Sequence, residues 1–306
     1  MNIFKLHPDG SVIYYMLERE IYLNETSRKY PYFYDCGDKI RHYAVCPACN
    51  NPIQIIGLFR KHTESPLYAK HIPKTIPDLA EYRQEAYENC PLAAKRNICA
   101  EKGQKKRGND GISKQLLNII EKNFDRIVYV LQRSLGIYVS ARLAENLLDD
   151  YLKEEAYLYK YASLINIPWM LAYFSRSRSL VRRIIHDEDI RKTIQKKVAD
   201  ATFNEKGQLI VKDDGKIRIL FYFTNHNIKF EKGFTCESID MEIYLSIMGR
   251  KEKICTKTIS FDYDYFRYMR NIPENKGRRN GELIALAQDK PRRYREDRKK
   301  FTFKDS

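Results

Sequence analysis

The residues of this sequence best suited to chemistry are cysteines spaced for metal binding. Five of the seven cysteines lie between residues 36 and 99, and Cys46-Pro47-Ala48-Cys49 forms a CxxC motif. This spacing lets two thiolates reach one tetrahedral ion. Asn50-Asn51-Pro52 follows, with the turn composition that closes a zinc knuckle. The odd cysteine count, without a secretory signal, favours thiols that are buried or metal-bound over a disulfide framework.

The second half of such a site must come from further along the chain. His71 and Cys90 are the candidates, which gives the predicted ligand set Cys46, Cys49, His71 and Cys90; His62 and Cys99 are the substitutes. Three cysteines and one histidine would fill all four positions of a zinc ion, so we predict a structural site with zinc as cofactor. A catalytic zinc would leave one position open, and neither HExxH nor HxE…PCxxC occurs in the sequence.

Two other interpretations of the cysteines stay open. They could be reduced, buried thiols, because a free cysteine behaves as a small hydrophobic residue. They could also form a redox dithiol, but such motifs usually open a helix, whereas the apolar run 53–59 after Pro52 predicts a strand.

The cysteine segment also has a resemblance to known modules. Cys46-Pro47-Ala48-Cys49, Lys70-His71 and Cys90-Pro91 resemble the Cys/His zinc ribbons that precede nuclease or DNA-handling domains in bacterial proteins. The likeness covers a short part of the chain, so no activity is carried over from it.

Positive charge is the second prominent feature. Lys and Arg number 55 against 40 Asp and Glu, a formal net charge of +15. The cations concentrate in the linker 102–107, in a predicted helix 176–197 and in a tail 276–304, and such clusters release counterions when they meet phosphates. We therefore predict nucleic-acid contacts at Arg182, Arg183, Lys196, Lys197, Arg292, Arg293, Arg295, Lys299 and Lys300. The alternative is an ordinary solvated surface.

The sequence identifies no catalytic residue. Asp240 and Glu242 lie two apart on a predicted strand, and Asp262 and Asp264 repeat this spacing. Such pairs are compatible with a metal-dependent nuclease, but they are also usual on the solvent face of a strand. His226 ends a predicted strand, where we favour a turn residue over a base. The motifs GxxxxGK[ST], GxGxxG and GxSxG are absent, which argues against phosphate-loop, dinucleotide-binding and hydrolase-elbow chemistry.

The pattern of apolar residues predicts an α+β fold. We expect a β-rich Cys/His zinc-binding module over 1–100, a basic linker over 101–112, a helical region over 113–200, and an antiparallel β region with a basic C-terminal tail over 201–306. The predicted strands are 11–17, 20–23, 53–59, 208–211, 217–224, 241–247 and 254–259, with a hairpin turn at 213–215. The predicted helices are 78–87, 113–136, 140–152, one starting at Pro168, 179–197 and 261–269.

Localisation and function follow as expectations. The apolar stretch 162–174 is too short to span a bilayer, and the first residues lack a secretory signal, so we expect a cytoplasmic protein that does not contact membranes. The predicted function is a zinc-stabilised protein that binds nucleic acid. The alternatives are the nuclease using Asp240 and Glu242, and a helical protein-interaction module without enzymatic activity, which would expose an apolar patch around Trp169.

Overall fold

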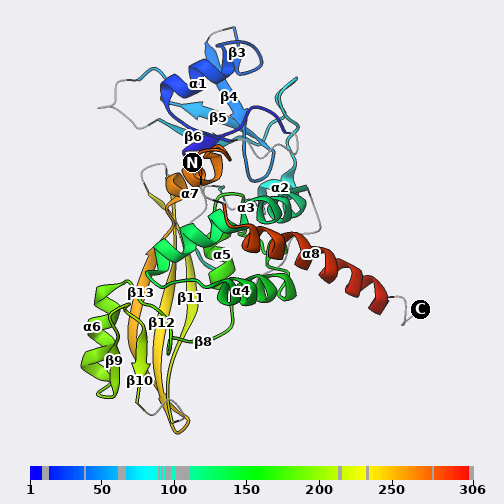
Figure 1. Cartoon of the computed structure of the whole chain (residues 1–306). Coiled ribbons are helices and arrows are strands. Elements are labelled where there is room, and N and C mark those ends of the chain that lie inside the picture. Colours follow the sequence, from blue (N-terminus) through cyan, green and yellow to red (C-terminus); the bar gives the residue numbers. More distant parts are fainter. Residues whose placement is uncertain are drawn as a thin grey trace. The chain divides into compact units, whose positions relative to one another are not determined.

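The structure is a computed structural model of the 306-residue chain (Figure 1). It describes residues 1–8, 14–37, 39–60, 67–88, 90, 92–93, 98–100, 102, 111–212, 216–231, 234–277 and 279–302. The chain divides into two compact units. Unit 1 comprises Met1–Leu116, Leu158–Leu164 and Asn227–Glu237, and unit 2 comprises Leu117–Tyr157, Ile165–His226 and Ser238–Ser306.

Unit 1 is built on a four-stranded antiparallel sheet with the strand order β3-β4-β5-β6. A two-stranded sheet, β1 with β2, and two helices accompany it. The elements are β1 (Ile3–Phe4), β2 (Tyr15–Met16), α1 (Arg19–Thr26), β3 (Phe33–Asp35), β4 (Ile40–Val45), β5 (Pro52–Ile56), β6 (Tyr68–His71), α2 (Gln84–Glu88) and β7 (Ile98–Ala100).

Two predictions in this region are wrong. Residues 20–23 form part of helix α1 instead of a strand, because Tyr22 and Thr26, four residues apart, are the positions that become buried. The Tyr22 hydroxyl donates to the backbone carbonyls of Tyr32 and Tyr43 at 3.1 and 2.8 Å, which holds the helix against the sheet. The helix predicted from 78 begins only at Gln84, because Asp78 has a left-handed backbone with φ of 57°.

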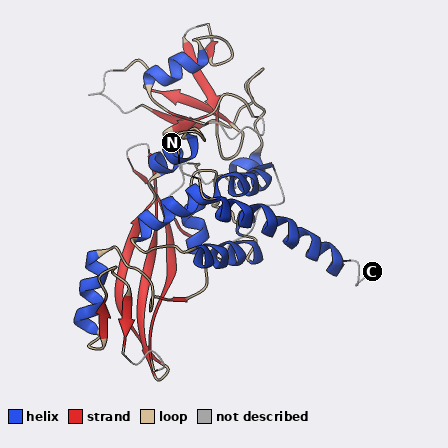
Figure 2. Cartoon of the chain, viewed as in Figure 1, coloured by secondary structure: helices blue, strands red, loops and turns tan. Residues whose placement is uncertain are grey.

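Unit 2 contains most of the helices (Figure 2). They are α3 (Gly111–Leu135, which begins in unit 1), α4 (Ala141–Lys153), a 3₁₀ turn (Ala156–Leu158), α5 (Ile167–Tyr173), α6 (Glu188–Lys197), α7 (Tyr263–Asn271) and α8 (Gly281–Thr302). The stop at Gly136 and the N-cap at Ser140, which accepts from the backbone N–H of Leu143 at 3.3 Å, are confirmed. The start of α5 near Pro168 is confirmed as well.

The basic helix predicted over 179–197 is wrong in its first half. Helix α6 begins after Asp187, and β8 (Arg178–Ser179) pairs with β11. Between them the backbone bonds to neighbouring strands, since the N–H of Leu180 donates to Ile219 and that of Arg182 to Leu209. Arg182 also has a left-handed φ of 66°, which a helix does not accept.

Antiparallel sheets make up the rest of unit 2. The strands are β9 (Ala201–Phe203), β10 (Leu209–Val211), β11 (Ile217–Glu231), β12 (Phe234–Ile247) and β13 (Arg250–Ser260). The end of β11 from Asn227 and the start of β12 up to Glu237 belong to unit 1. The order in the larger sheet is β13-β12-β11-β7, with β8 also on β11, whereas β10 pairs with β9. Strands β10 and β11 therefore lie in different sheets, and the hairpin turn predicted at 213–215 lies outside the described residues. Ile219, Phe221 and Phe223 are buried on one face of β11.

The predicted basic tail is a helix. Ala287 on α8 is fully buried, and the Lys290 ammonium pairs with Glu145 and Asp149 of α4 at 3.0 and 2.7 Å. Two negative partners and a buried face therefore fix the first half of α8 to α4. The predicted α+β class, with an N-terminal sheet, central helices and a C-terminal sheet, is confirmed.

Trp169 lies in the core of unit 2. It is fully buried, its ring stacks on Phe261 with centroids 4.6 Å apart, and its indole N–H donates to the Ser134 hydroxyl at 3.2 Å. Trp169 itself therefore exposes no apolar surface of the kind that the interaction-module alternative expects there.

One ion pair joins three elements of unit 2. The Lys257 ammonium on β13 lies 2.7 Å from the Asp187 carboxylate and also donates to the carbonyls of Ser134 and Leu135 at the end of α3. Asp187 is the N-cap of α6 and accepts from the N–H of Ile190 at 2.9 Å. Burial raises the pKa of Asp187, but Lys257 and the backbone donors outweigh it, so the pKa lies below its ordinary value.

Asp187→Asn should remove the negative charge and keep the helix cap, because asparagine caps helices as well as aspartate does. A group with a depressed folded-state pKa contributes stability above its unfolded pKa, near 4, and loses it as the pH falls through the folded value. We expect a loss of about 2 kcal/mol at neutral pH, typical of hydrogen bonds to charged groups, which disappears as the pH falls through the folded-state pKa of Asp187. Urea unfolding of both proteins at several pH values measures this. A pH-independent difference would contradict it.

Candidate metal centre

The CxxC motif forms a tight turn after β4. Cys46 follows the last residue of that strand, and its N–H donates to the Asn51 carbonyl at 2.9 Å while its own carbonyl accepts from Asn50 at 3.0 Å. Asn50 provides the left-handed residue that the turn requires, with φ of 60°. The turn brings both thiols to the same end of the sheet.

His71 and Cys90 come from two other segments. His71 is the last residue of β6 and lies opposite Ile53 of β5, the strand that the CxxC turn leads into. Cys90 follows α2, and its N–H donates to the Tyr87 carbonyl at 3.0 Å. The register of β6 on β5 therefore positions His71, and the end of α2 positions Cys90.

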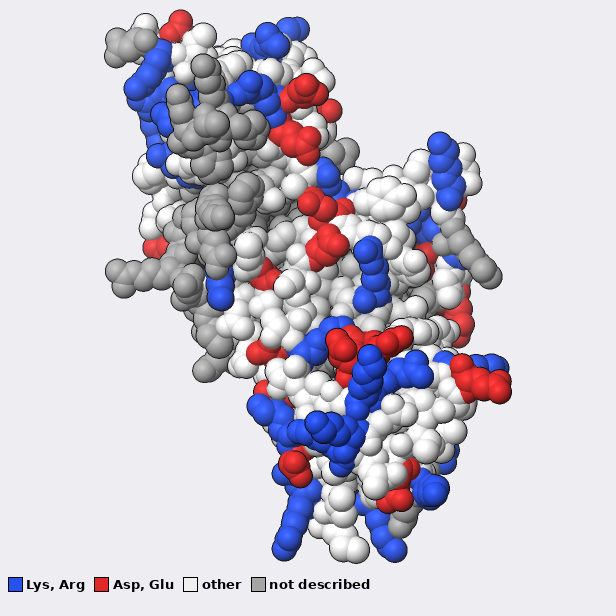
Figure 3. Space-filling view, turned by 90° about the vertical axis from the view of Figure 1, so that its left-hand side faces the viewer, with Lys and Arg blue, Asp and Glu red and all other residues white. Residues whose placement is uncertain are grey.

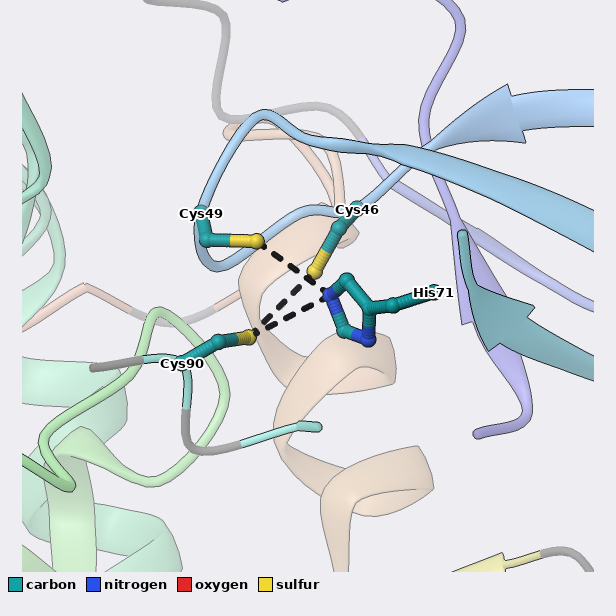
Figure 4. Close-up of side chains that lie close together, drawn as sticks. All are labelled: Cys46, Cys49, His71 and Cys90. Atoms are coloured by element: carbon teal, nitrogen blue, oxygen red, sulfur yellow. Dashed lines mark hydrogen bonds between the residues drawn. The ribbon is translucent and has the colours of Figure 1, made fainter. Parts of the chain in front are cut away.

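The four side chains converge (Figure 4). Their sulfur and nitrogen atoms all lie within 4.8 Å of one another. Cys46 Sγ is 3.7 Å from Cys90 Sγ, and His71 Nε2 is 3.2 Å from Cys49 Sγ and 3.5 Å from Cys90 Sγ. A tetrahedral zinc with Zn–S near 2.3 Å and Zn–N near 2.05 Å would place two sulfurs about 3.8 Å apart and sulfur and nitrogen about 3.5 Å apart. These three distances match those of a tetrahedral site within a few tenths of an ångström.

Burial and contacts within the cluster shift the pKa values of the three thiols. Cys46, Cys49 and Cys90 are each at most 2% exposed. Burial raises the pKa of Cys46 and of Cys90 well above the usual value, and contact with Cys49 adds to this. Burial also opposes ionisation of Cys49, but hydrogen bonds from Cys46, Cys90 and His71 outweigh it and lower its pKa. Without a cation the cluster favours one thiolate, whereas a bound metal favours all three.

Asn51 ties the two halves of the cluster together. It is fully buried, and its amide donates to Cys49 Sγ at 3.5 Å and to the Arg83 carbonyl at 3.1 Å while its carbonyl accepts from the Arg83 N–H at 2.6 Å. It thus connects the CxxC turn to the segment that carries Cys90. The sequence marks Asn51 only as a turn residue, since a contact across 32 positions leaves no local pattern.

The substitute ligands are not placed by this structure. His62 and the side chain of Cys99 lie outside the described residues. Among those described, Cys46, Cys49, His71 and Cys90 are the one group of three or more histidine, cysteine or acidic side chains that could hold an ion.

The acidic pairs proposed for a nuclease serve structural roles. Asp240 accepts from Asn225 and from Thr258, and Glu242 accepts from Tyr244 and pairs with Lys253 at 3.2 Å. Asp262 caps α7, and Asp264 lies 3.9 Å from Arg267. No acidic cluster suited to a metal occurs in the described part of the chain.

The interpretation of His226 as a turn residue is wrong. Strand β11 continues to Glu231, and His226 is fully buried within it, stacked on Phe261 with ring centroids 5.7 Å apart. Asn225 takes a left-handed backbone, φ of 53°, so that the buried positions shift from 219, 221 and 223 to 226 and 228. The strand thus changes phase at Asn225 instead of ending.

The predicted nucleic-acid residues fall into three groups. Lys196 and Lys197 are exposed at the end of α6. Arg182 and Arg183 lie on the loop before α6, where the Arg183 guanidinium donates to the Ser179 carbonyl. The side chains of Arg292, Arg293, Arg295, Lys299 and Lys300, on α8, lie outside the described residues, as does most of the predicted linker 101–112.

The fold and the cluster define the class: an α+β protein with a Cys₃His group, of three buried cysteines and a half-buried histidine, that could hold a metal ion. Comparison with protein-family models, curated proteins and solved structures finds no match to this chain. Within the described residues, no helix has the length and apolar character needed to cross a membrane. The placement of domain boundaries around 101–112 stays a prediction.

Proposed function

We propose that this chain is a zinc-stabilised protein that binds nucleic acid. The observation that carries the zinc assignment is the convergence of three cysteine sulfurs and one imidazole nitrogen with tetrahedral spacing. Thiolate and imidazole ligands suit zinc, and sites of this composition with four protein ligands are structural.

The composition of the centre supports a structural role. Four side chains would fill the coordination of zinc and leave no position for water or substrate. Asn51, which hydrogen-bonds Cys49, is an amide engaged with Arg83 and not a carboxylate that could act as a base. The metal would hold together the CxxC turn, strand β6 and the segment after α2.

The cationic surface of unit 2 supports nucleic acid as the partner. Lys196 and Lys197 are exposed and form no ion pair with any described residue. Helix α6 contacts β13, which adds exposed Arg250 and Lys251. Figure 3 shows Lys and Arg side chains gathered over the lower part of the molecule, with acidic residues among them. Several cations on one surface favour a polyphosphate chain through counterion release.

The other two functions have weaker support. A nuclease would need carboxylates available for a metal, whereas Asp240 and Glu242 are held by neighbouring side chains. A helical interaction module would need an exposed apolar surface, whereas Trp169 is buried.

Charge reversal on α6 tests the nucleic-acid part. Lys196→Glu with Lys197→Glu should weaken binding to duplex DNA about tenfold or more and reduce the slope of log affinity against log salt by about 1.8, because each lost phosphate contact removes about 0.9. Lys114→Glu with Lys122→Glu, two exposed lysines on α3, is the charge-matched control. Titrations between about 50 and 200 mM salt measure both values. Equal effects in the control and the α6 variant would contradict the assignment of α6.

A further inference from the structure

The sheet of unit 1 has one face turned toward the core and one that is open in part. Residues directly opposite in antiparallel strands share a face, and successive residues alternate. Ala44, Ile53, Ile55 and Ala69 share the core face and are each at most 3% exposed. The opposite face carries Tyr34 against Arg41, Tyr43 against Gln54, Gln54 against Lys70, and Ile56 against Tyr68.

This second face is cationic and aromatic. Arg41 and Lys70 are exposed, and Tyr34, Gln54 and Tyr68 are half-buried. No position of β3 to β6 on this face is acidic. Neither Arg41 nor Lys70 forms an ion pair with a described residue, and no described group hydrogen-bonds the hydroxyls of Tyr34 and Tyr68.

The aromatic residues extend beyond the strands. Tyr30 is 53% exposed and packs its ring against Tyr34 with centroids 5.8 Å apart, while its hydroxyl donates to Asp78. Tyr34 and Tyr68 lie on the two outer strands, so three strand spacings, about 14 Å, separate their backbones. The face therefore offers more than one ring, with Arg41 on a strand between Tyr34 and Tyr68, and Lys70 on the same outer strand as Tyr68.

We propose that this face, defined by Tyr34, Arg41, Gln54, Tyr68 and Lys70, binds single-stranded nucleic acid. Bases stack on the tyrosine rings, and Arg41 and Lys70 contact phosphates. A duplex keeps its bases stacked inside, where tyrosines fixed on a sheet do not reach them, so the rings select the single strand. The inference rests on the proposed nucleic-acid function but places a second contact surface on unit 1, separate from α6.

The test is a fluorescence anisotropy titration of the full chain with labelled oligothymidylate at several salt concentrations. Tyr34→Ala with Tyr68→Ala should weaken binding about ten- to a hundredfold with an unchanged salt slope, because stacking is not ionic. Arg41→Gln with Lys70→Gln should reduce the slope by about 1.4, since each phosphate contact to a single strand contributes about 0.7.

Matched variants separate these effects from damage to the fold. Tyr34→Phe with Tyr68→Phe keeps the rings and should bind within about threefold of the wild type. Lys74→Gln removes an exposed lysine outside the strands and should leave the affinity unchanged. Unchanged circular dichroism establishes that each variant is folded. Photo-crosslinking of the wild-type chain to an iodouracil oligonucleotide should label Tyr34 or Tyr68, which requires no variant.

The outcomes are distinguishable. If the wild-type chain binds neither duplex nor single strand, the proposed function fails and this inference with it. If it binds nucleic acid but the Tyr34/Tyr68 and Arg41/Lys70 variants match the wild type, this inference alone fails. Binding of polyglutamate that needs Arg41 and Lys70, with oligothymidylate unaffected by the tyrosine changes, would overturn it in favour of an acidic polypeptide.

Discussion

Chelation of the zinc that we propose for the Cys₃His group should unfold the segment from β4 to Cys90. The four ligands come from three separate stretches of chain, and three of them are buried thiols whose proximity is unfavourable once more than one is ionised. Structural zinc contributes about 10–16 kcal/mol in small zinc-binding peptides, comparable to the whole stability of a domain, about 5–15 kcal/mol. The free energy lost with the ion is therefore expected to exceed the stability of the small sheet of unit 1.

Hydrogen exchange with and without a strong zinc chelator measures this effect residue by residue. Amides of β4, β5 and β6 should lose protection by several orders of magnitude, and Cys46→Ser with Cys49→Ser should reproduce the loss without chelator. Cys36→Ser is the matched control, because Cys36 is exposed and lies outside the cluster. Retained protection of β4 to β6 in the chelated protein would show that the cluster does not stabilise this sheet.

Gly136→Ala should produce the second large effect. Gly136 ends α3 with φ of 69°, and a Cβ built there would lie 2.7 Å from Cβ of Asp187. The left-handed backbone costs about 1 kcal/mol for a residue with a side chain, and overpacking adds about 1–3 kcal/mol. Displacing Asp187 would also disturb its bonds to Lys257 and Ile190. We expect a total loss near 3 kcal/mol.

Urea unfolding of unit 2, followed by the fluorescence of its buried Trp169, measures the loss. Gly281→Ala is the matched control, because Gly281 begins α8 and nothing lies within 4 Å of the position of its Cβ. That variant should equal or exceed the wild type in stability. A Gly136→Ala protein as stable as Gly281→Ala would contradict the packing described around Asp187.

The cluster was predictable from the sequence because cysteines spaced to bind one metal ion leave a local pattern. Cys46 and Cys49 are paired by their spacing, and His71 and Cys90 were the side chains of the right type downstream. The structure brings all four together. The bonds of Asn51 to Arg83 could not be predicted, because they depend on how the chain returns after β6.

Helices with a long apolar stripe and a clear cap were predicted well. Buried positions such as Leu116, Ile120 and Phe124 repeat at helical spacing along α3, and Ser140 caps α4. Short segments, and segments that hydrogen-bond to neighbouring strands, were not predicted well. Residues 20–23 alternate like a strand yet form α1, and 180–187 bond to neighbouring strands instead of continuing α6 backwards.

Surfaces that depend on strand register were out of reach of the sequence. Tyr34, Arg41, Gln54, Tyr68 and Lys70 are spread over 37 positions and share a face only because of the pairings β3-β4, β4-β5 and β5-β6. The phase change at Asn225, which buries His226, is likewise visible only in the backbone.

Zinc K-edge X-ray absorption of the purified protein, with metal content per chain, tests the central claim most directly. Coordination by Cys46, Cys49, His71 and Cys90 predicts one zinc per chain, with three sulfur atoms near 2.3 Å and one nitrogen near 2.05 Å. The Cys46→Ser/Cys49→Ser protein should contain none. A wild-type protein without zinc, a shell of oxygen and nitrogen atoms only, or full zinc in the double variant would contradict the assignment.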